Sequence, residues 1–121
     1  MEPLKVVLYQ NDAATAERLA ASLSRSFPSV YLTHSREEIR SAIARSRAEV
    51  LVLDVETSDE RELERLHHEF PGLYIVCTHR LASDELWTET LSRGAADLCV
   101  PWNADEVVRS LTRERARRAA A

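Results

Sequence analysis

Residues 49–56 read EVLVLDVE, a run of four consecutive apolar residues that ends in an aspartate, Asp54. Continuous apolar runs of this length are typical of strands that are buried on both faces. A second run of the same kind, LYIVCT, occupies residues 73–78. The two runs predict the central strands of a parallel sheet, because a strand with one face in water alternates apolar and polar residues.

Three further runs complete a regular pattern: KVVLY at 5–9, SVYLT at 29–33 and DLCV at 97–100. Each of the five runs is followed by a stretch in which apolar residues recur every three or four positions, as on the buried face of a helix. Strict alternation of five strands and five helices predicts an α/β domain with helices on both faces of a parallel sheet.

Polar residues mark where the helices begin. These residues are Asn11 or Asp12, Ser35 with Glu38, Ser83, and Asn103 with Glu106. Their side chains can accept hydrogen bonds from the free N–H groups of a first helical turn, and two of the pairs have capping-box spacing. Pro71 and Gly72 predict the end of the third helix.

The chain has 121 residues, of which 45% are hydrophobic and 30% charged. This length and composition predict a single globular domain, residues 1–121. No segment has the ~18 consecutive apolar residues that cross a bilayer. The opening MEPLKVVLYQND lacks the pattern of a signal peptide, so we expect a cytoplasmic protein with no membrane partner. Cys77 and Cys99 lie in apolar runs without a Cys/His cluster, which predicts buried free thiols.

The net charge of -4 argues against nonspecific nucleic-acid binding by the domain as a whole. The last helix is an exception, because from position 109 it carries five arginines and one acid, Glu114. Cations are favourable at the end of a helix, so a solvated helix end is the first interpretation. A nucleic-acid contact, or the start of a connector to an output domain, is the alternative.

In an open parallel sheet, binding sites form where loops leave the carboxyl ends of the strands. The residues at these points are Gln10, Asn11 and Asp12 after the first strand, Asp54 and Glu56 after the third, Thr78 and His79 after the fourth, and Val100, Pro101 and Trp102 after the fifth.

Taken in order, these motifs resemble the receiver domain of response regulators in bacterial two-component signal transduction. KVVLYQND resembles a KILIVDDE-type opening, EVLVLDVE a DLVLLDL-type strand, YIVCTH a PVIVLTA-type strand and GAADLCVPW a GADDYLVKPF-type ending. The resemblance covers essentially the whole chain. It implies a flavodoxin-like, doubly wound sheet of five strands in the order 2-1-3-4-5, with Asp54 as the phospho-acceptor and Thr78 as the hydroxyl residue.

The same resemblance implies that a histidine kinase is the partner that donates the phosphoryl group, and that the transfer needs Mg²⁺ held by an acidic pair, together with a lysine. The acidic pair falls on the neutral amides Gln10 and Asn11; shifting the alignment to include Asp12 would lengthen the first strand by one residue. Val100 or a deletion stands in place of the lysine, and His79 replaces a small residue. The loop ETSDERELERL after the acceptor also lacks the proline common in the family.

These departures favour an atypical receiver, or pseudo-receiver, that acts through protein contacts or dimerisation without efficient phosphorylation of Asp54. In this interpretation Asp54 holds the loops through hydrogen bonds. The alternative is a phosphorylatable receiver that binds Mg²⁺ weakly through Asp54, Glu56 and Asp12 and controls an attached or separate output, for example a DNA-binding domain. Both interpretations predict no resident cofactor beyond weakly bound Mg²⁺.

The resemblance places the partner surface on the fourth helix, the fifth strand and the fifth helix. Candidate interface residues there are Trp87, Leu91, Trp102, Val107 and Val108. Each tryptophan fits an interface or the core equally well. The aromatic switch residue of the family is replaced by Leu98 or Asp97. The sequence has no Gly-rich phosphate loop, no GxSxG motif and no Cys/His pair, so we expect no enzyme.

Overall fold

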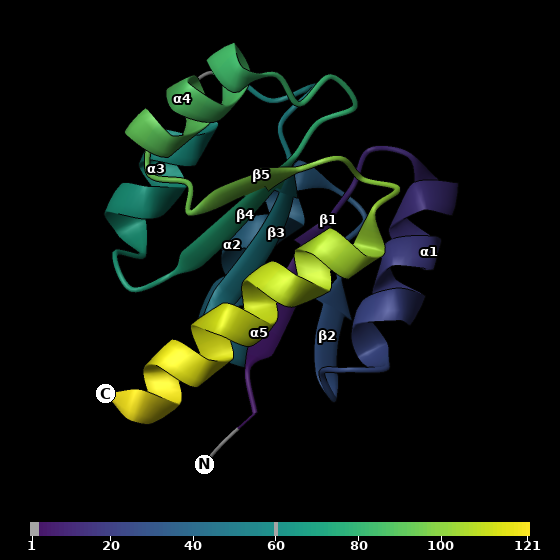
Figure 1. The fold of residues 1–121 in the computed structure, drawn as a ribbon, viewed down its shortest axis with the longest axis vertical. Helices are drawn as coiled ribbons and strands as arrows, with labels where there is room; N and C mark the ends of the chain where they lie inside the picture. The colour runs from purple at the N-terminus through teal and green to yellow at the C-terminus, as the bar shows by residue number, and fades with distance from the viewer. Residues whose placement is uncertain (1–2, 60) are drawn as a thin grey trace.

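In the computed structural model, which describes residues 3–59 and 61–121, five parallel strands form one sheet (Figure 1). The sheet order is β2-β1-β3-β4-β5, which confirms the predicted fold class and strand order. The strands are β1 (Lys5–Tyr9), β2 (Ser29–Leu32), β3 (Val50–Asp54), β4 (Tyr74–Thr78) and β5 (Asp97–Cys99). Every residue of the central strand β3 is buried, as its unbroken apolar run predicts.

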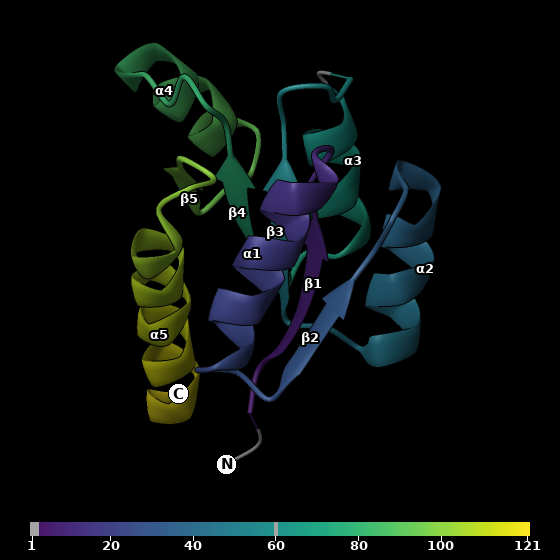
Figure 2. The same ribbon diagram turned by 90° about the vertical axis from the view of Figure 1, so that its right-hand side faces the viewer.

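Five helices cover the two faces of the sheet. They are α1 (Ala13–Ser24), α2 (Arg36–Ser46), α3 (Glu62–Glu69), α4 (Asp84–Ser92) and α5 (Ala104–Ala120). Figure 2 shows α1 and α5 on one side of the sheet and α2 and α3 on the other. The core is accordingly divided into two apolar clusters, one on each face. Among the described residues, no helix is long and apolar enough to span a membrane.

Three of the predicted helix starts are capped by their own side chains. Asp12 accepts a 2.9 Å hydrogen bond from the N–H of Thr15 at α1, and Ser83 and Asn103 do the same at α4 and α5. Ser35 precedes α2, but its side chain makes no capping bond, so that half of the predicted capping box is wrong. Glu38 does accept a backbone hydrogen bond, but the donor is the N–H of His34, the residue before Ser35, and not the N–H of Ser35 that a capping box requires.

The two cysteines are buried on neighbouring strands and face opposite sides of the sheet. Cys77 belongs to the cluster under α2 and α3, and Cys99 belongs to the cluster under α1 and α5. Both thiols are free, as predicted. Burial raises the pKa of each thiol to about 12, so neither forms a reactive thiolate near neutral pH.

The arginine-rich end of α5 is tied to the domain. Arg115 stacks on the ring of Phe27, with 4.9 Å to the ring centroid. Arg117 and Arg118 both bind the carboxylate of Glu114, which is only 3% exposed. Arg118 also donates a 2.7 Å hydrogen bond to the carbonyl of Gly72, next to β4. Much of the positive charge of this helix end is therefore compensated within the fold.

Replacing Glu114 by glutamine is expected to lower the free energy of unfolding by about 1–2 kcal/mol at neutral pH, because the arginines lose a charged acceptor. The hydrogen bond from Arg117, and then that from Arg118, hold the Glu114 pKa below its ordinary value of 4.5. A lowered folded-state pKa stabilises the fold above the unfolded value and loses that stabilisation as the pH falls through the folded one.

The difference between the two proteins should therefore shrink as the pH falls below 4.5. Urea denaturation at several pH values measures it, and the exposed Glu17→Gln variant is the matched control. A loss that is independent of pH would contradict the ion-pair explanation.

Candidate functional site

Asp54 is the last residue of β3 and lies beside Thr78, its neighbour in β4. Its side chain is buried, at 5% exposure. One carboxylate oxygen accepts a 3.0 Å hydrogen bond from the backbone N–H of Asn11, and the other accepts a 2.9 Å bond from the N–H of Glu56. Asp54 therefore joins the loop after β1 to the loop after β3.

Gln10 and Thr78 form a second buried contact at the same edge. The Gln10 amide Nε2 donates a 2.7 Å hydrogen bond to the Thr78 hydroxyl. Strand β1 ends at Tyr9, and Gln10 and Asn11 follow it; the Gln10 side chain is buried, whereas Asn11 is exposed and reaches Asp54 through its backbone N–H. Asp12 lies one residue further, is exposed, and uses its carboxylate to cap α1. The structure thus brings together Gln10, Asn11, Asp54 and Thr78, with Asp12 at their margin.

Arg80, which the sequence analysis did not single out, connects two loops next to Asp54. Its guanidinium Nε lies 2.7 Å from Glu56 Oε1, which joins the loop after β4 to the loop after β3. Burial alone would raise the Glu56 pKa, but the hydrogen bond and charge of Arg80 outweigh it and hold that pKa below its ordinary value. Glu56 is therefore ionised and paired near neutral pH.

Arg36, at the start of α2, secures the other side of the β3–α3 loop. It donates hydrogen bonds to the backbone carbonyl of Asp54, at 3.0 Å, and to the hydroxyl of Thr57, at 2.7 Å. It also forms an ion pair with Glu62 and lies over the Tyr9 ring, 4.8 Å from its centroid. One side chain thus fixes a strand end, a loop and the first turn of α3.

A cavity of about 480 Å³ opens beside Asp54. The residues that line it come from the loops after β1, β3, β4 and β5 and from the first turn of α1, and they are Gln10, Asn11, Asp12, Thr15, Asp54, Glu56, Thr57, Arg80 and Pro101. Two of its carboxylates are already engaged, since Asp12 caps α1 and Glu56 pairs with Arg80. The cavity is therefore a polar pocket whose charged side chains already have partners within the fold.

These residues do not fit the Mg²⁺ that the receiver fold implies. Mg²⁺ requires nearly octahedral oxygen ligands, with carboxylates to balance its charge. Gln10 turns an amide N–H toward Thr78, and both Asp54 oxygens already accept N–H groups. Among residues 3–59 and 61–121, no group of three or more His, Cys, Asp or Glu side chains is placed to hold a metal.

The structure places His79 and Val100 less centrally than the sequence suggests. His79 is half-buried, and its Nδ1 accepts a 2.9 Å hydrogen bond from the N–H of Leu81 within the same loop. The residue of this loop that lines the cavity is Arg80. Val100 is half-buried and precedes Pro101, which is buried and lines the cavity.

The candidate interface residues divide into exposed and buried ones. Trp87 and Leu91 project from α4 and are 48% and 39% exposed, and Trp102 is 67% exposed. The prediction for Val107 is wrong, because this residue is fully buried between α5 and the sheet. Val108 is half-buried against the same cluster. Of these five candidates, the exposed ones therefore lie on α4 and in the loop before α5.

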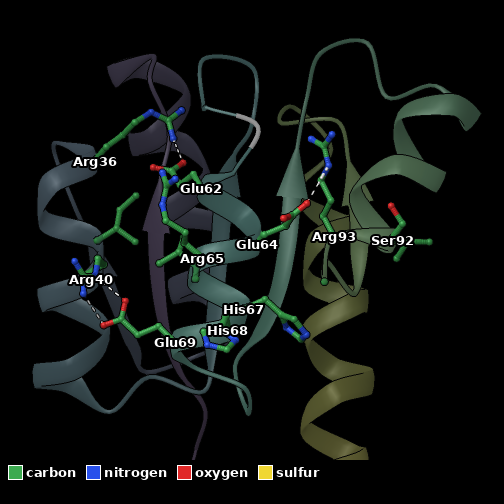
Figure 3. A pocket seen from close by; sticks show the side chains of 14 residues that line it. Arg36, Arg40, Glu62, Glu64, Arg65, His67, His68, Glu69, Ser92 and Arg93 are labelled. Carbon is green, nitrogen blue, oxygen red and sulfur yellow. Dashed lines mark hydrogen bonds and ion pairs between the residues drawn. The ribbon is translucent and has the colours of Figure 1, made fainter.

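A larger cavity, of about 940 Å³, is lined by residues of α2, α3 and α4 and by the two residues that follow α4 (Figure 3); Asp54 is not among its lining residues. The ion pairs Arg36–Glu62 and Arg40–Glu69 tie α3 to α2. The pair Arg93–Glu64 ties α3 to the residue that follows α4. The charged residues drawn in Figure 3 thus largely pair across this cavity, which indicates a structural role in holding α3.

No family model matches the chain, and no curated protein matches it. Many solved structures do match it. A response regulator from Clostridium difficile gives a TM-score of 0.81 at 17% identity, with 98% of this chain and 99% of that chain covered. The receiver domain of a DNA-binding response regulator from Colwellia psychrerythraea gives 0.81 at 13% identity, covering 93% and 98%. A pilus assembly-related protein from Burkholderia pseudomallei gives 0.78 at 21% identity, covering 93% and 90%.

The agreement extends over nearly the whole length of both chains in each comparison, and the sheet order is the one that the sequence predicts. At these identities the similarity establishes the fold. The chain has the receiver-domain fold of two-component response regulators.

Proposed function

We propose that this chain is an atypical receiver that acts in the cytoplasm as a protein-interaction module, without efficient Mg²⁺-dependent phosphorylation of Asp54. One observation carries the proposal: both Asp54 carboxylate oxygens accept backbone N–H groups, while the neighbouring acid Glu56 is neutralised by Arg80. In this arrangement Asp54 serves as a structural acceptor between two loops.

The charge balance supports the same conclusion. A carboxylate that attacks a phosphoryl group brings further negative charge into the site, and a metal ion normally compensates it. Here the cation that lines the cavity among the described residues is Arg80, whose guanidinium is held by Glu56 at 2.7 Å. Gln10 and Asn11 offer no negative charge to attract Mg²⁺.

A phosphorylatable receiver is the second candidate function, and the cavity beside Asp54 favours it. Its volume of about 480 Å³ leaves room for a phosphoryl group, and Asp12 and Glu56 both line it. For Mg²⁺ to bind there, Glu56 would have to leave Arg80 and Asp12 would have to give up its cap. That cost makes this the weaker candidate.

The partner we propose is a protein: a second copy of this chain, an attached output domain or a separate signalling protein. The surface that supports this is the exposed part of α4, where Trp87 and Leu91 stand one helical turn apart. Aromatic side chains of this kind are enriched among the residues that dominate binding energy at interfaces. Nucleic acid would then be reached only through an attached domain, because the arginines of α5 are largely bonded within the fold.

Incubation with Mg²⁺ and acetyl phosphate, followed by intact-mass analysis, tests the proposal. The expected result is no mass increase by one phosphoryl group. A matched variant restores the missing groups, with Asn11→Asp and Val100→Lys, and is expected to gain a measurable phosphorylated fraction. This comparison tests whether the absent acid and lysine are what prevents the reaction.

A phosphoryl-sized mass increase in the unaltered chain that disappears in the Asp54→Asn variant would overturn the proposal and establish the second candidate. An increase that persists in Asp54→Asn would come from another residue and would leave the proposal standing. Titration with beryllofluoride and Mg²⁺, monitored by tryptophan fluorescence, gives an independent reading of the same site.

A further inference from the structure

A second cavity, of about 420 Å³, lies between α1 and the loop that leads from β5 to α5. Its volume falls within the roughly 300–1,000 Å³ typical of small-molecule sites. We call it the α1–Trp102 groove and define it by Arg18 and Ser22 on α1, by Arg25 directly after α1, and by Arg80, Pro101 and Trp102 on the opposite wall. The cavity beside Asp54 shares Arg80 and Pro101 with this groove, so the two are neighbours.

The α1 wall of the groove presents a row of polar side chains. Arg18, Ser22 and Arg25 are spaced four and three residues apart, which places them on one face of the helix. At 1.5 Å per residue, the two arginines are about 10 Å apart along the helix axis. Phosphate groups attached to a small organic molecule can be contacted along such a row.

The charge of the groove is positive. Its charged lining residues are Arg18, Arg25 and Arg80, and the described lining residues include no carboxylate. Arg80 is already paired with Glu56. Within residues 3–59 and 61–121, Arg18 and Arg25 form no ion pair at 4 Å or less. Arg18 interacts electrostatically with Asp12 but is not bonded to it, so neither guanidinium group is held by a carboxylate.

Apart from Arg80, the opposite wall is apolar and aromatic. Trp102 is 67% exposed although it lines the groove, and it stands next to the buried Pro101. An exposed indole offers a flat surface on which an aromatic ring can stack, a contact that is typical of nucleobase binding. Arginine guanidinium groups are suited to bidentate contacts with phosphate oxygens.

We propose that the α1–Trp102 groove binds a nucleoside phosphate, with the base stacked on Trp102 and the phosphates held by Arg18 and Arg25. The juxtaposition of two unpaired guanidinium groups and one exposed indole in a cavity of this size carries the proposal. It does not depend on whether Asp54 is phosphorylated, because neither Asp54 nor Glu56 lines the groove.

Trp87 and Trp102 are the two tryptophans of the chain, so the Trp87→Phe variant reports on Trp102 alone. We expect ADP, added with a chelator and without Mg²⁺, to quench this fluorescence saturably with a Kd on the order of 0.1 mM. Arg18→Glu with Arg25→Glu should weaken binding at least about tenfold. Isothermal titration calorimetry should show a loss of about tenfold for Trp102→Ala, the size expected when one stacked base is lost.

Arg45→Glu with Arg61→Glu is the matched control, since it makes the same change in net charge on α2 and just before α3, on the other face of the sheet. It should bind ADP as the parent does. Inorganic tripolyphosphate and a polyglutamate peptide are the competing probes, and each should bind more weakly than ADP.

Four results would overturn the proposal. They are no saturable quenching at millimolar ADP, unchanged affinity in the Arg18/Arg25 variant, tripolyphosphate binding as tight as ADP, and polyglutamate binding tighter than ADP. The third would reduce the groove to a simple anion site, and the fourth would make it a docking site for an acidic protein segment. Circular dichroism of each variant separates loss of binding from loss of folding.

Discussion

Replacing Asp54 by alanine is expected to lower the free energy of unfolding by about 2–3 kcal/mol, because two backbone N–H groups lose a charged acceptor. These are the N–H groups of Asn11 and Glu56, at 3.0 and 2.9 Å from the carboxylate. Asp54→Asn should lose about half as much, since its amide oxygen can still accept one of the two bonds. Urea denaturation monitored by circular dichroism measures both variants.

This result bears directly on function. In a site that collects carboxylates for a metal, removing one relieves repulsion and commonly stabilises the fold at the expense of activity. Where the carboxylate is itself a structural acceptor, its removal destabilises the fold. The exposed Glu17→Ala variant is the control and should change stability by less than about 0.5 kcal/mol. An Asp54→Ala protein more stable than the parent would contradict the structural role of Asp54.

Gly94→Ala is expected to be at least as damaging, with a loss of about 2–4 kcal/mol. Gly94 lies between α4 and β5 at a φ of 113°, a conformation that residues with a side chain rarely adopt. A Cβ at this position would also lie 2.4 Å from Cγ of His67 on α3. Both backbone strain and a steric clash oppose the substitution.

A double-mutant cycle separates the two effects. His67→Ala in the Gly94→Ala background should recover the part caused by the clash, about 1–2 kcal/mol, and leave the backbone strain. Gly72→Ala is the matched control, because a Cβ there meets nothing within 4 Å, and it should cost little. If Gly72→Ala and Gly94→Ala had equal effects, the close approach of Gly94 to α3 would not be the reason for this glycine.

Much of the fold could be predicted because its signals are local. The unbroken apolar runs that became β3 and β4 indicate strands buried on both faces, and that pattern needs no knowledge of distant residues. The position of Asp54 followed, since a residue at the carboxyl end of a central parallel strand lies at the edge where sites form. The cap at Ser35 was a partial failure, because its spacing allowed a bond that the side chain does not make.

The prediction that Val107 lies at a partner interface failed because the sequence does not define how a helix is rotated against the sheet. Positions 107 and 108 are both valines in an amphipathic helix, and which of them faces the sheet depends on how α5 is rotated against it. The structure buries Val107 completely and leaves Val108 half-buried. A sequence period identifies the apolar face of a helix but does not give the orientation of each residue.

The sequence by itself determined the α/β class and placed Asp54 among the neutral amides Gln10 and Asn11, since apolar period and residue chemistry act over a few neighbouring positions. The tertiary structure alone decided that Arg80 pairs with Glu56 and that Arg36 binds the backbone carbonyl of Asp54 at the end of β3. Those partners lie 24 and 18 residues apart in the chain. Whether such distant groups meet depends on the paths of the loops between them, which no local pattern encodes.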